Sequence, residues 1–299
     1  MAKRYSKELE DLIISQYNNG ISPYKMIKTI PELYNKRPSV IYGVLKRKGI
    51  KSHNEHLLTD EQRLQRRTYN VNDNYFNIID NEHKAYWLGF IYADGYITST
   101  EDKIGISLSI EDKNHLEKFK NDINFTGPIC DYKAENGYSG KTIYSRILIA
   151  SKQMKNDLKK LGVLENKTEI ITFPNSSQVP DKFINDFIRG YIDGDGSITH
   201  GHKQLNGKWN YSIKVVGTLN MIQNIQKQFD INVKLEQRHP ERNVNNYQIT
   251  IGGNRQIKRI LDLLYSNADI YLERKYNRYK QFVSSMANAT EDHGVLERN

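Results

Sequence analysis

The spacing of hydrophobic residues changes several times along the chain, and these changes divide it into segments. Residues 3–50 carry three apolar runs at helical spacing, and they predict three short helices. Residues 51–79 are polar and lack this periodicity, which indicates a linker. From residue 286 the sequence is polar again, so we expect a disordered tail over 286–299.

The two segments between the linker and the tail, residues 80–175 and 176–285, predict the same order of elements. Each reads as helix, two strands, helix, two strands and helix, with period-two alternation in the strands. Repetition of this whole order indicates an internal duplication. We therefore predict an α+β fold of two pseudo-symmetric αββαββα halves with antiparallel sheets. A small all-α domain over residues 1–50 precedes them.

The first helix of each half ends in a similar run, residues 87–95 and residues 188–196. Both runs are mainly apolar and finish with an aspartate and a glycine, and the aspartates, Asp94 and Asp195, are 101 residues apart. Small residues recur four apart on one helical face, which lets two helix backbones approach closely. These interface residues are Gly89, Ala93, Gly190 and Gly194. The pattern predicts that the two helices pack together and bring the two aspartates to the same end.

Two carboxylates at adjoining helix C-termini are electrostatically unfavourable, because the helix dipoles and the carboxylates themselves repel negative charge. A divalent cation relieves both effects, and Mg²⁺ or Mn²⁺ suits such hard oxygen ligands. These ions support phosphodiester hydrolysis. Alternatively, an Asp-Gly pair simply ends a helix in a turn, but two copies at matching positions favour the metal site over this interpretation.

The composition points to a polyanionic partner. Lys and Arg number 44 against 35 Asp and Glu, which favours nucleic acid, although a membrane surface or another acidic partner would also fit. The single cysteine, Cys130, excludes an internal disulfide and a cysteine-rich zinc site. No stretch has the length and hydrophobicity of a membrane span or a signal peptide, so we expect a soluble intracellular protein.

Alternation along the predicted strands leaves basic and amide side chains opposite the core, where they suit base edges and phosphates. These candidate DNA-binding residues are Arg146, Lys214, Lys234, Arg238 and Gln248. In residues 1–50, a basic third helix resembles the last helix of a helix-turn-helix unit. It adds Lys46, Arg47 and Lys48, unless the unit is only a packing module with a solvated basic end.

Residues 87–95 and 188–196 resemble the two signature motifs of the single-chain LAGLIDADG homing endonucleases, and the resemblance extends over residues 80–285. It implies a monomer whose sheets form a saddle over double-stranded DNA. It also implies that Asp94 and Asp195 bind the catalytic ions, with the carbonyl groups of Ala93 and Gly194 as further contacts. Tyr92 replaces the first acidic residue of the motif, which Asp193 keeps, and that position is not the metal-binding one.

The resemblance further implies a basic catalytic residue near the active site of each half. Lys167 and Lys275 fall at corresponding positions, although both could equally be surface lysines. The expected function is magnesium-dependent cleavage of both strands of a long non-palindromic DNA site by the product of a mobile genetic element. Alternatives are a non-cleaving DNA-binding regulator and an RNA-binding helper of intron splicing. The expected location is the cytoplasm of a bacterial or phage-infected cell, or an organelle.

Overall fold

A computed structural model of the chain describes residues 5–50, 67–133, 142–203, 209–242 and 244–296. For residues 201–203, 209 and 287–296 it describes only the secondary structure. The chain divides into two compact units, residues 1–69 and residues 70–299, and each is described by itself. Most of the predicted linker, residues 51–66, lies outside the described residues.

The first unit contains the three helices that the apolar spacing predicts. The Ser6 and Ser22 hydroxyls cap the first two helices by accepting backbone N–H bonds, each at 3.2 Å. One apolar cluster holds the helices together, with Ile13, Met26 and Val44 fully buried. The helices are α1 (Lys7–Asn18), α2 (Pro23–Thr29) and α3 (Ser39–Arg47), with a short 3₁₀ turn at Pro31–Leu33.

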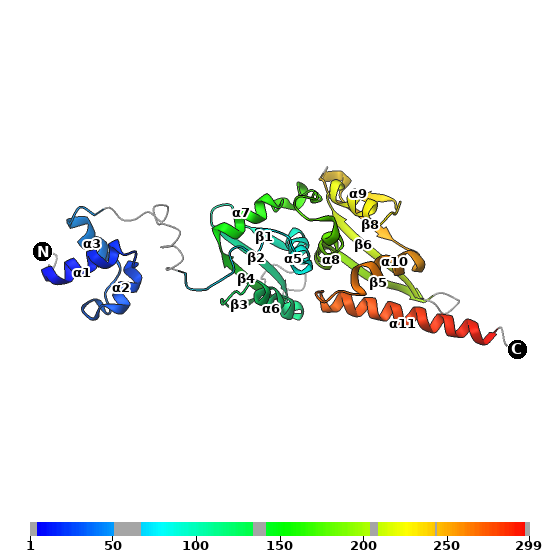
Figure 1. Cartoon of the computed structure of the whole chain (residues 1–299), viewed down its shortest axis with the longest axis horizontal. Coiled ribbons are helices and arrows are strands. Elements are labelled where there is room, and N and C mark those ends of the chain that lie inside the picture. Colours follow the sequence, from blue (N-terminus) through cyan, green and yellow to red (C-terminus); the bar gives the residue numbers. More distant parts are fainter. Residues whose placement is uncertain (1–4, 51–66, 134–141, 204–208, 243, 297–299) are drawn as a thin grey trace. The chain divides into compact units, whose positions relative to one another are not determined.

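The second unit consists of two halves with the same order of elements (Figure 1). The first half contains α5 (Glu82–Ala93), β1 (Gly95–Ile97), β2 (Lys103–Ser109), α6 (Lys113–Asp122), β3 (Ile129–Lys133), β4 (Ile143–Ala150) and α7 (Lys152–Lys160). The second contains α8 (Ile184–Asp195), β5 (Gly196–Lys203), β6 (Trp209–Gly217), α9 (Leu219–Gln228), β7 (Leu235–Gln237), β8 (Tyr247–Ile251) and α10 (Asn254–Tyr265). Helix α11 (Glu273–Leu296) follows.

The two sheets are antiparallel and share one topology, so the predicted α+β duplication is confirmed. Their strand orders are β1-β2-β4-β3 and β5-β6-β8-β7. In both sheets alternate residues face the apolar core, for example Ile213 and Val215, while Lys214 between them is exposed. Helices pack on the core side of each sheet, which leaves its other face open.

Helices α5 and α8 lie side by side at the centre of this unit (Figure 1). Residues 85–92 of α5 are all buried, because the helix is enclosed by α8 on one side and by its own half on the other. Glycine makes the close approach possible. A Cβ atom at Gly89 would lie 1.9 Å from the Phe187 carbonyl oxygen, and one at Gly190 would lie 1.9 Å from that of Tyr86. The predicted helix interface is therefore present.

Three segments differ from the sequence-based expectation. Residues 70–79 belong to the second unit rather than to a linker, because Phe76 and Ile79 are buried in its core. Helix α11 continues to Leu296, where the polar composition suggests a disordered tail from residue 286. Strand β7 covers only Leu235–Gln237, although the alternation extends over 232–238.

Candidate functional site

The ends of α5 and α8 bring together the two aspartates that the repeated motif singles out. Asp94 is the C-cap of α5, and Asp195 is the last residue of α8. A Cβ atom at Gly194 would lie 2.3 Å from the Ala93 Cβ and 3.4 Å from the Asp94 Oδ2, so the small residue before Asp195 makes room for the Asp94 carboxylate. Strands β1 and β5 begin directly after the aspartates, so both sheets extend from this point.

Both carboxyl groups reach solvent, yet they lie among many protein atoms that remove part of their hydration. This partial desolvation, reinforced by the charge of Asp195, raises the pKa of Asp94 to about 6. Desolvation also raises the pKa of Asp195, against the opposing charges of Lys167, Lys275 and Arg238. The site therefore holds two carboxyl groups whose ionisation is unfavourable without a further positive charge.

Two lysines, at corresponding places in the two halves, lie at the base of the helix pair. Lys167, which is half-buried, donates from Nζ to the Ala93 carbonyl oxygen at 2.6 Å. Lys275, only 2% exposed, donates to the carbonyl oxygens of Ile192 and Asp193, both at 2.5 Å, and to that of Gly194 at 3.3 Å. Neither is an ordinary surface lysine. Burial lowers both pKa values, that of Lys275 to about 8, and the nearby aspartates counteract this effect.

The donor set fits a hard divalent cation. Two carboxylates and the carbonyl oxygens of Ala93 and Gly194 are the kind of ligand that Mg²⁺ prefers. Each of these carbonyl groups accepts a lysine hydrogen bond, but a carbonyl oxygen has two lone pairs and keeps one for another partner. The raised carboxyl pKa values are also those expected where a cation completes the charge balance.

The open sheet faces carry the predicted DNA-binding side chains. Strand pairing places Lys214 beside Ser197 and Thr250, and Gln248 beside Val216 and Glu236. In the first sheet Arg146 is exposed, and its guanidinium lies 5.3 Å from the centre of the Tyr132 ring. Lys234 and Arg238 are exposed at β7, and Lys234 lies 3.9 Å from Glu236. These open faces thus offer both basic and hydrogen-bonding side chains.

Two of the three basic residues predicted to contact DNA in the first unit have a partner within it. Arg47 and Lys48 pair with the Glu10 carboxylate at 3.0 and 3.1 Å, and these two cations hold the pKa of Glu10 below its usual value. Lys46 is exposed, as are Ser39 and Tyr42 on the same helix. Side chains at this spacing share one helical face, so residues 39, 42 and 46 lie on one solvent-exposed face of α3.

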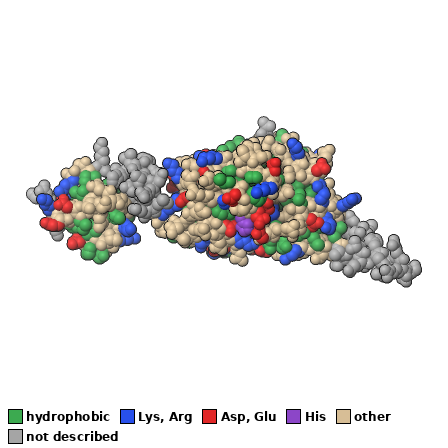
Figure 2. All heavy atoms as spheres, viewed as in Figure 1, with side chains coloured by type: hydrophobic (Ala, Val, Ile, Leu, Met, Phe, Trp, Pro, Cys, Tyr) green, Lys and Arg blue, Asp and Glu red, His purple; other side chains and the backbone are tan. Residues whose placement is uncertain are grey.

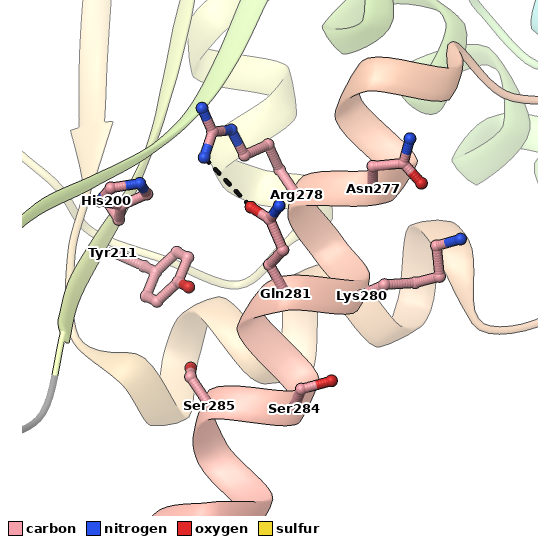
Figure 3. Close-up of a pocket in the computed structure, with 8 residues that line it drawn as sticks. All are labelled: His200, Tyr211, Asn277, Arg278, Lys280, Gln281, Ser284 and Ser285. Atoms are coloured by element: carbon pink, nitrogen blue, oxygen red, sulfur yellow. Dashed lines mark hydrogen bonds between the residues drawn. The ribbon is translucent and has the colours of Figure 1, made fainter.

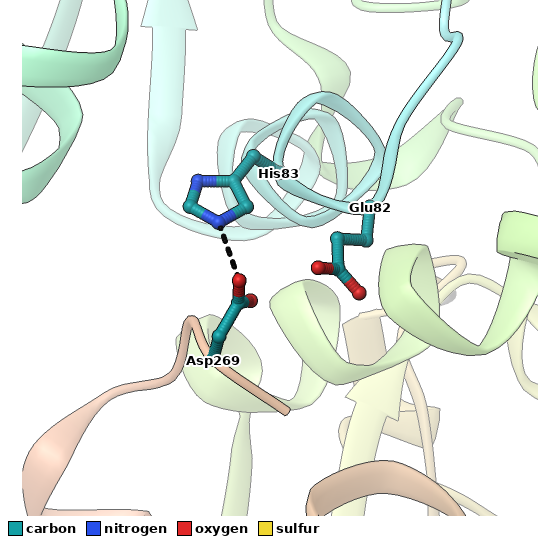
Figure 4. A group of neighbouring side chains, drawn as sticks. All are labelled: Glu82, His83 and Asp269. Carbon is teal, nitrogen blue, oxygen red and sulfur yellow. Dashed lines mark hydrogen bonds and ion pairs between the residues drawn. The ribbon is translucent and has the colours of Figure 1, made fainter. Parts of the chain in front are cut away.

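A second polar cluster joins the two halves at the beginning of α5 (Figure 4). His83 bonds Asp122 through Nδ1 at 2.8 Å and Asp269 through Nε2 at 3.2 Å, and Glu82 lies beside them. The bond to Asp122, reinforced by Asp269, raises the pKa of His83 to about 9. With both ring nitrogens engaged, His83 acts as a charged link between the halves. Histidine amid acidic residues is also visible on the face shown in Figure 2, where acidic and basic side chains are intermixed.

A groove of about 770 Å³ lies between α11 and the strands β5 and β6 (Figure 3). Arg278 and Lys280 line it together with uncharged polar side chains and His200, and the described lining residues include no carboxylate. None of the predicted site residues contributes to it. The candidate site is thus the open surface at the base of the helix pair and not this groove.

Comparison with known proteins shows that one segment of the chain resembles a known protein family. Residues 182–265, which run from the 3₁₀ turn just before α8 to the end of α10, match the sequence profile of the LAGLIDADG-like domain. This segment of the second half is similar to the LAGLIDADG-like domain. The matched segment contains Asp195 and the helix-interface residues Gly190 and Gly194, and the first half repeats its topology.

The proteins similar to the chain include a curated relative and the solved structures of two meganucleases. An uncharacterized protein of Methanocaldococcus jannaschii is 26% identical over 153 residues, which are 50% of this chain and 52% of that protein, so the chain spans about half the length of this relative. A crystal structure of the meganuclease I-SmaMI bound to DNA is 14% identical, with a TM-score of 0.48, and covers 71% of this chain and 91% of its own. A crystal structure of the LAGLIDADG meganuclease I-AabMI bound to DNA is 12% identical, with a TM-score of 0.47, and the match covers 71% of this chain and 92% of that one.

The structure also reveals residues that the sequence analysis did not single out. Asp193 lies at the motif position set aside as not metal-binding, yet it is completely buried and accepts hydrogen bonds from Tyr86 and Tyr265. Because the Tyr86 hydroxyl donates to Asp193, its oxygen is left to accept from His115 Nε2 at 2.9 Å. Burial lowers the pKa of His115 to about 3, which keeps it neutral. The sequence did contain one sign of this difference, because the two motifs carry different residues, Tyr92 and Asp193, at the same position.

In the described part of the chain no helix has the length and apolar character that a bilayer crossing requires.

Proposed function

We propose that the chain is a site-specific DNA endonuclease that hydrolyses both strands of a long, non-palindromic duplex with Mg²⁺ or Mn²⁺. The observation that carries the proposal is the convergence of Asp94 and Asp195 at the base of one helix pair, with a lysine from each half beside them. The LAGLIDADG-like domain of the second half supports the same reaction class.

The residues of the site divide the work between metal binding and charge stabilisation. Asp94, Asp195 and the carbonyl groups of Ala93 and Gly194 would hold the divalent ions, which when bound supply an activated water and stabilise the leaving oxygen. Lys167 and Lys275 carry the positive charge that stabilises an anionic phosphoryl transition state. Because both lysines are held by backbone oxygens, their charges are fixed in place before a substrate arrives.

The open sheet faces would bind the duplex on either side of the aspartates. Arg146, Lys214, Lys234, Arg238 and Gln248 suit phosphates and major-groove base edges, and the register places Lys214 in one row with hydroxyl side chains. The halves differ in these side chains, so the site read should not be palindromic. The chain would act as a monomer, because both halves are present in one polypeptide.

The first unit would add a further contact with DNA. The solvent-exposed face of α3 carries Lys46 and Tyr42 and no acidic side chain, which suits the major groove. Arg47 and Lys48 would contribute positive charge near the phosphates, while their pairing with Glu10 fixes α3 against α1. In this proposal Lys46 and Tyr42 read bases and the two paired cations act at longer range.

The test is a cleavage and binding assay with duplexes drawn from the DNA that flanks the gene, because a homing enzyme cuts near its own insertion point. We expect double-strand cleavage with Mg²⁺ and none with a chelator. Asp94→Asn and Asp195→Asn should each reduce cleavage by at least about 100-fold, since a divalent ion contributes several kcal/mol to such a transition state. Both variants should bind the duplex as tightly as the unmodified chain.

Asp230→Asn is the matched control, because it makes the same change at an exposed turn of the second half with a positive φ that Asn adopts readily. It should cut normally. Footprints of the full chain and of Lys46→Ala then test the first unit, and loss of protection outside the central site is expected. Binding without cleavage by the unmodified chain would favour a DNA-binding regulator, and preference for RNA would favour a splicing helper.

A further inference from the structure

Among the residues that the structure describes, a buried carboxylate lies next to the candidate site in the second half and none does so in the first. Asp193 is completely enclosed, and its oxygens accept hydrogen bonds from three separate parts of the chain. The Tyr265 hydroxyl, at the end of α10, donates to Oδ1 at 2.7 Å. The Tyr86 hydroxyl, from α5 of the other half, donates to Oδ2 at 2.7 Å, and the Leu272 N–H donates to the same oxygen at 2.8 Å. A carboxylate with this many donors fixes the elements that supply them.

One of these donors sets the position of the second-half lysine. Leu272 immediately precedes α11, and its carbonyl oxygen accepts from the Lys275 N–H at 2.9 Å in the first turn of that helix. The Nζ of Lys275 donates hydrogen bonds to the carbonyl oxygens of Ile192 and Asp193 on α8. Asp193 therefore holds both ends of this arrangement, the start of α11 through its carboxylate and the lysine ammonium through its backbone oxygen.

The first half has no counterpart of this carboxylate. The corresponding residue, Tyr92, donates its hydroxyl to the carbonyl oxygen of Leu161, the C-cap of α7. Lys167 has one backbone acceptor, Ala93, and is only half-buried. The two lysines thus occupy similar places but are held in different ways.

We propose that Asp193 is a positioning residue for Lys275, and that it makes the two halves of the site unequal. Its carboxylate anchors the first turn of α11 against α8 and α5, so that the ammonium of Lys275 stays fixed at the end of α8. Loss of the carboxylate frees Lys275 and leaves Lys167 unaffected. A second consequence, for the two DNA strands, rests on the endonuclease function proposed above. Loss of Asp193 slows cleavage of one DNA strand more than the other.

The first test measures the exposure of the lysines and needs no nuclease activity. The full chain is treated briefly with an amine-acylating reagent, and acylation at Lys275, Lys167 and the exposed Lys280 is quantified by mass spectrometry. In the unmodified chain Lys275 should react more slowly than Lys280. In Asp193→Asn its rate should rise about tenfold or more, as expected when a charge-assisted buried hydrogen bond is lost, with Lys167 unchanged. Tyr92→Phe, the matched change in the first half, should leave Lys275 protected.

The second test follows each strand of an end-labelled duplex. Asp193→Asn should accumulate a nicked product in which the same strand is always uncut, with the ratio of strand rates changed by about tenfold. Tyr92→Phe should retain the original ratio. A general loss of structure would slow both strands together, so the ratio separates positioning from stability. If Asp193→Asn does not fold, Tyr265→Phe removes a single donor and should show both effects in weaker form.

Continued protection of Lys275 in a folded Asp193→Asn or Tyr265→Phe variant would overturn the positioning role. Equal slowing of both strands would overturn the inequality of the halves. If the unmodified chain cuts no duplex at all, the endonuclease proposal fails, whereas the acylation result still decides whether Asp193 positions Lys275.

Discussion

Asp94→Asn should stabilise the metal-free protein, because the carboxylate at this position is held where ionisation is unfavourable. The pKa of Asp94 is about 6 in the folded chain, against a usual value of 3.8. A difference of about two units corresponds to about 3 kcal/mol at about 1.36 kcal/mol per unit. The side chain reaches solvent, which screens the interaction, so we expect about 1 kcal/mol.

The sign of this effect fixes its dependence on pH. Between about pH 4 and pH 6 the folded chain keeps a proton on Asp94 that the unfolded chain has lost, so the free energy of unfolding falls as the pH rises through this window. Above it the full penalty is present, and below it the penalty is absent. Asp94→Asn should therefore exceed the unmodified chain in stability at about pH 7.5 and match it at about pH 4.

Urea unfolding in a chelator, followed by tryptophan fluorescence, measures this difference. Both tryptophans, Trp87 and Trp209, belong to the second unit, so the signal reports the unit that contains the site. Added Mg²⁺ should stabilise the unmodified chain more than the variant, because a ligand that binds only the folded state stabilises it. Asp230→Asn should change nothing. Equal or lower stability of Asp94→Asn at about pH 7.5, or an advantage that grows as the pH falls, would refute this reasoning.

Two further predictions concern the contacts that join the halves. Gly89→Ala would place its Cβ 1.9 Å from the Phe187 carbonyl oxygen. It should therefore lower the free energy of unfolding, measured by the same urea titration, by at least about 2 kcal/mol. The control Gly252→Ala has open space around it and should have little effect. His83 is protonated in the folded chain up to about pH 9, so its contribution is complete below about pH 6.5 and is lost as the pH rises through about 9. Between these two pH values the free energy of unfolding should fall by about 1 kcal/mol, a figure already reduced for the solvent exposure of the ring. The His83→Gln variant should not show this fall. The same slope in both proteins would exclude His83 as its source.

The parts of the structure that follow from local periodicity could be predicted from the sequence. Ser22 and Pro23 begin α2 as capping rules require, and the alternation at Ile213, Lys214 and Val215 gives the face of β6. The close approach of α5 and α8 followed from glycine spacing, because only the absence of a side chain permits it.

Features that depend on distant partners could not be predicted in this way. Lys275 is buried because the end of α8 presents three carbonyl oxygens to it, and no local pattern marks a lysine for that fate. Arg47 pairs with Glu10, 37 residues away, and nothing in the basic sequence around Arg47 indicates this partner. Residues 70–79 contain too few apolar side chains to show periodicity, yet Phe76 is completely buried.

The reciprocal contact between Gly89 and Gly190 has an evolutionary consequence. Each glycine lies against a main-chain oxygen of the other helix, at Phe187 and at Tyr86, so the fit at these two points depends on backbone shape. Mutational drift can therefore change side chains that lie away from these points and keep the two helix backbones aligned. After an ancestral gene fused with its own copy, this tolerance would let one half acquire Asp193 while the other acquired Tyr92.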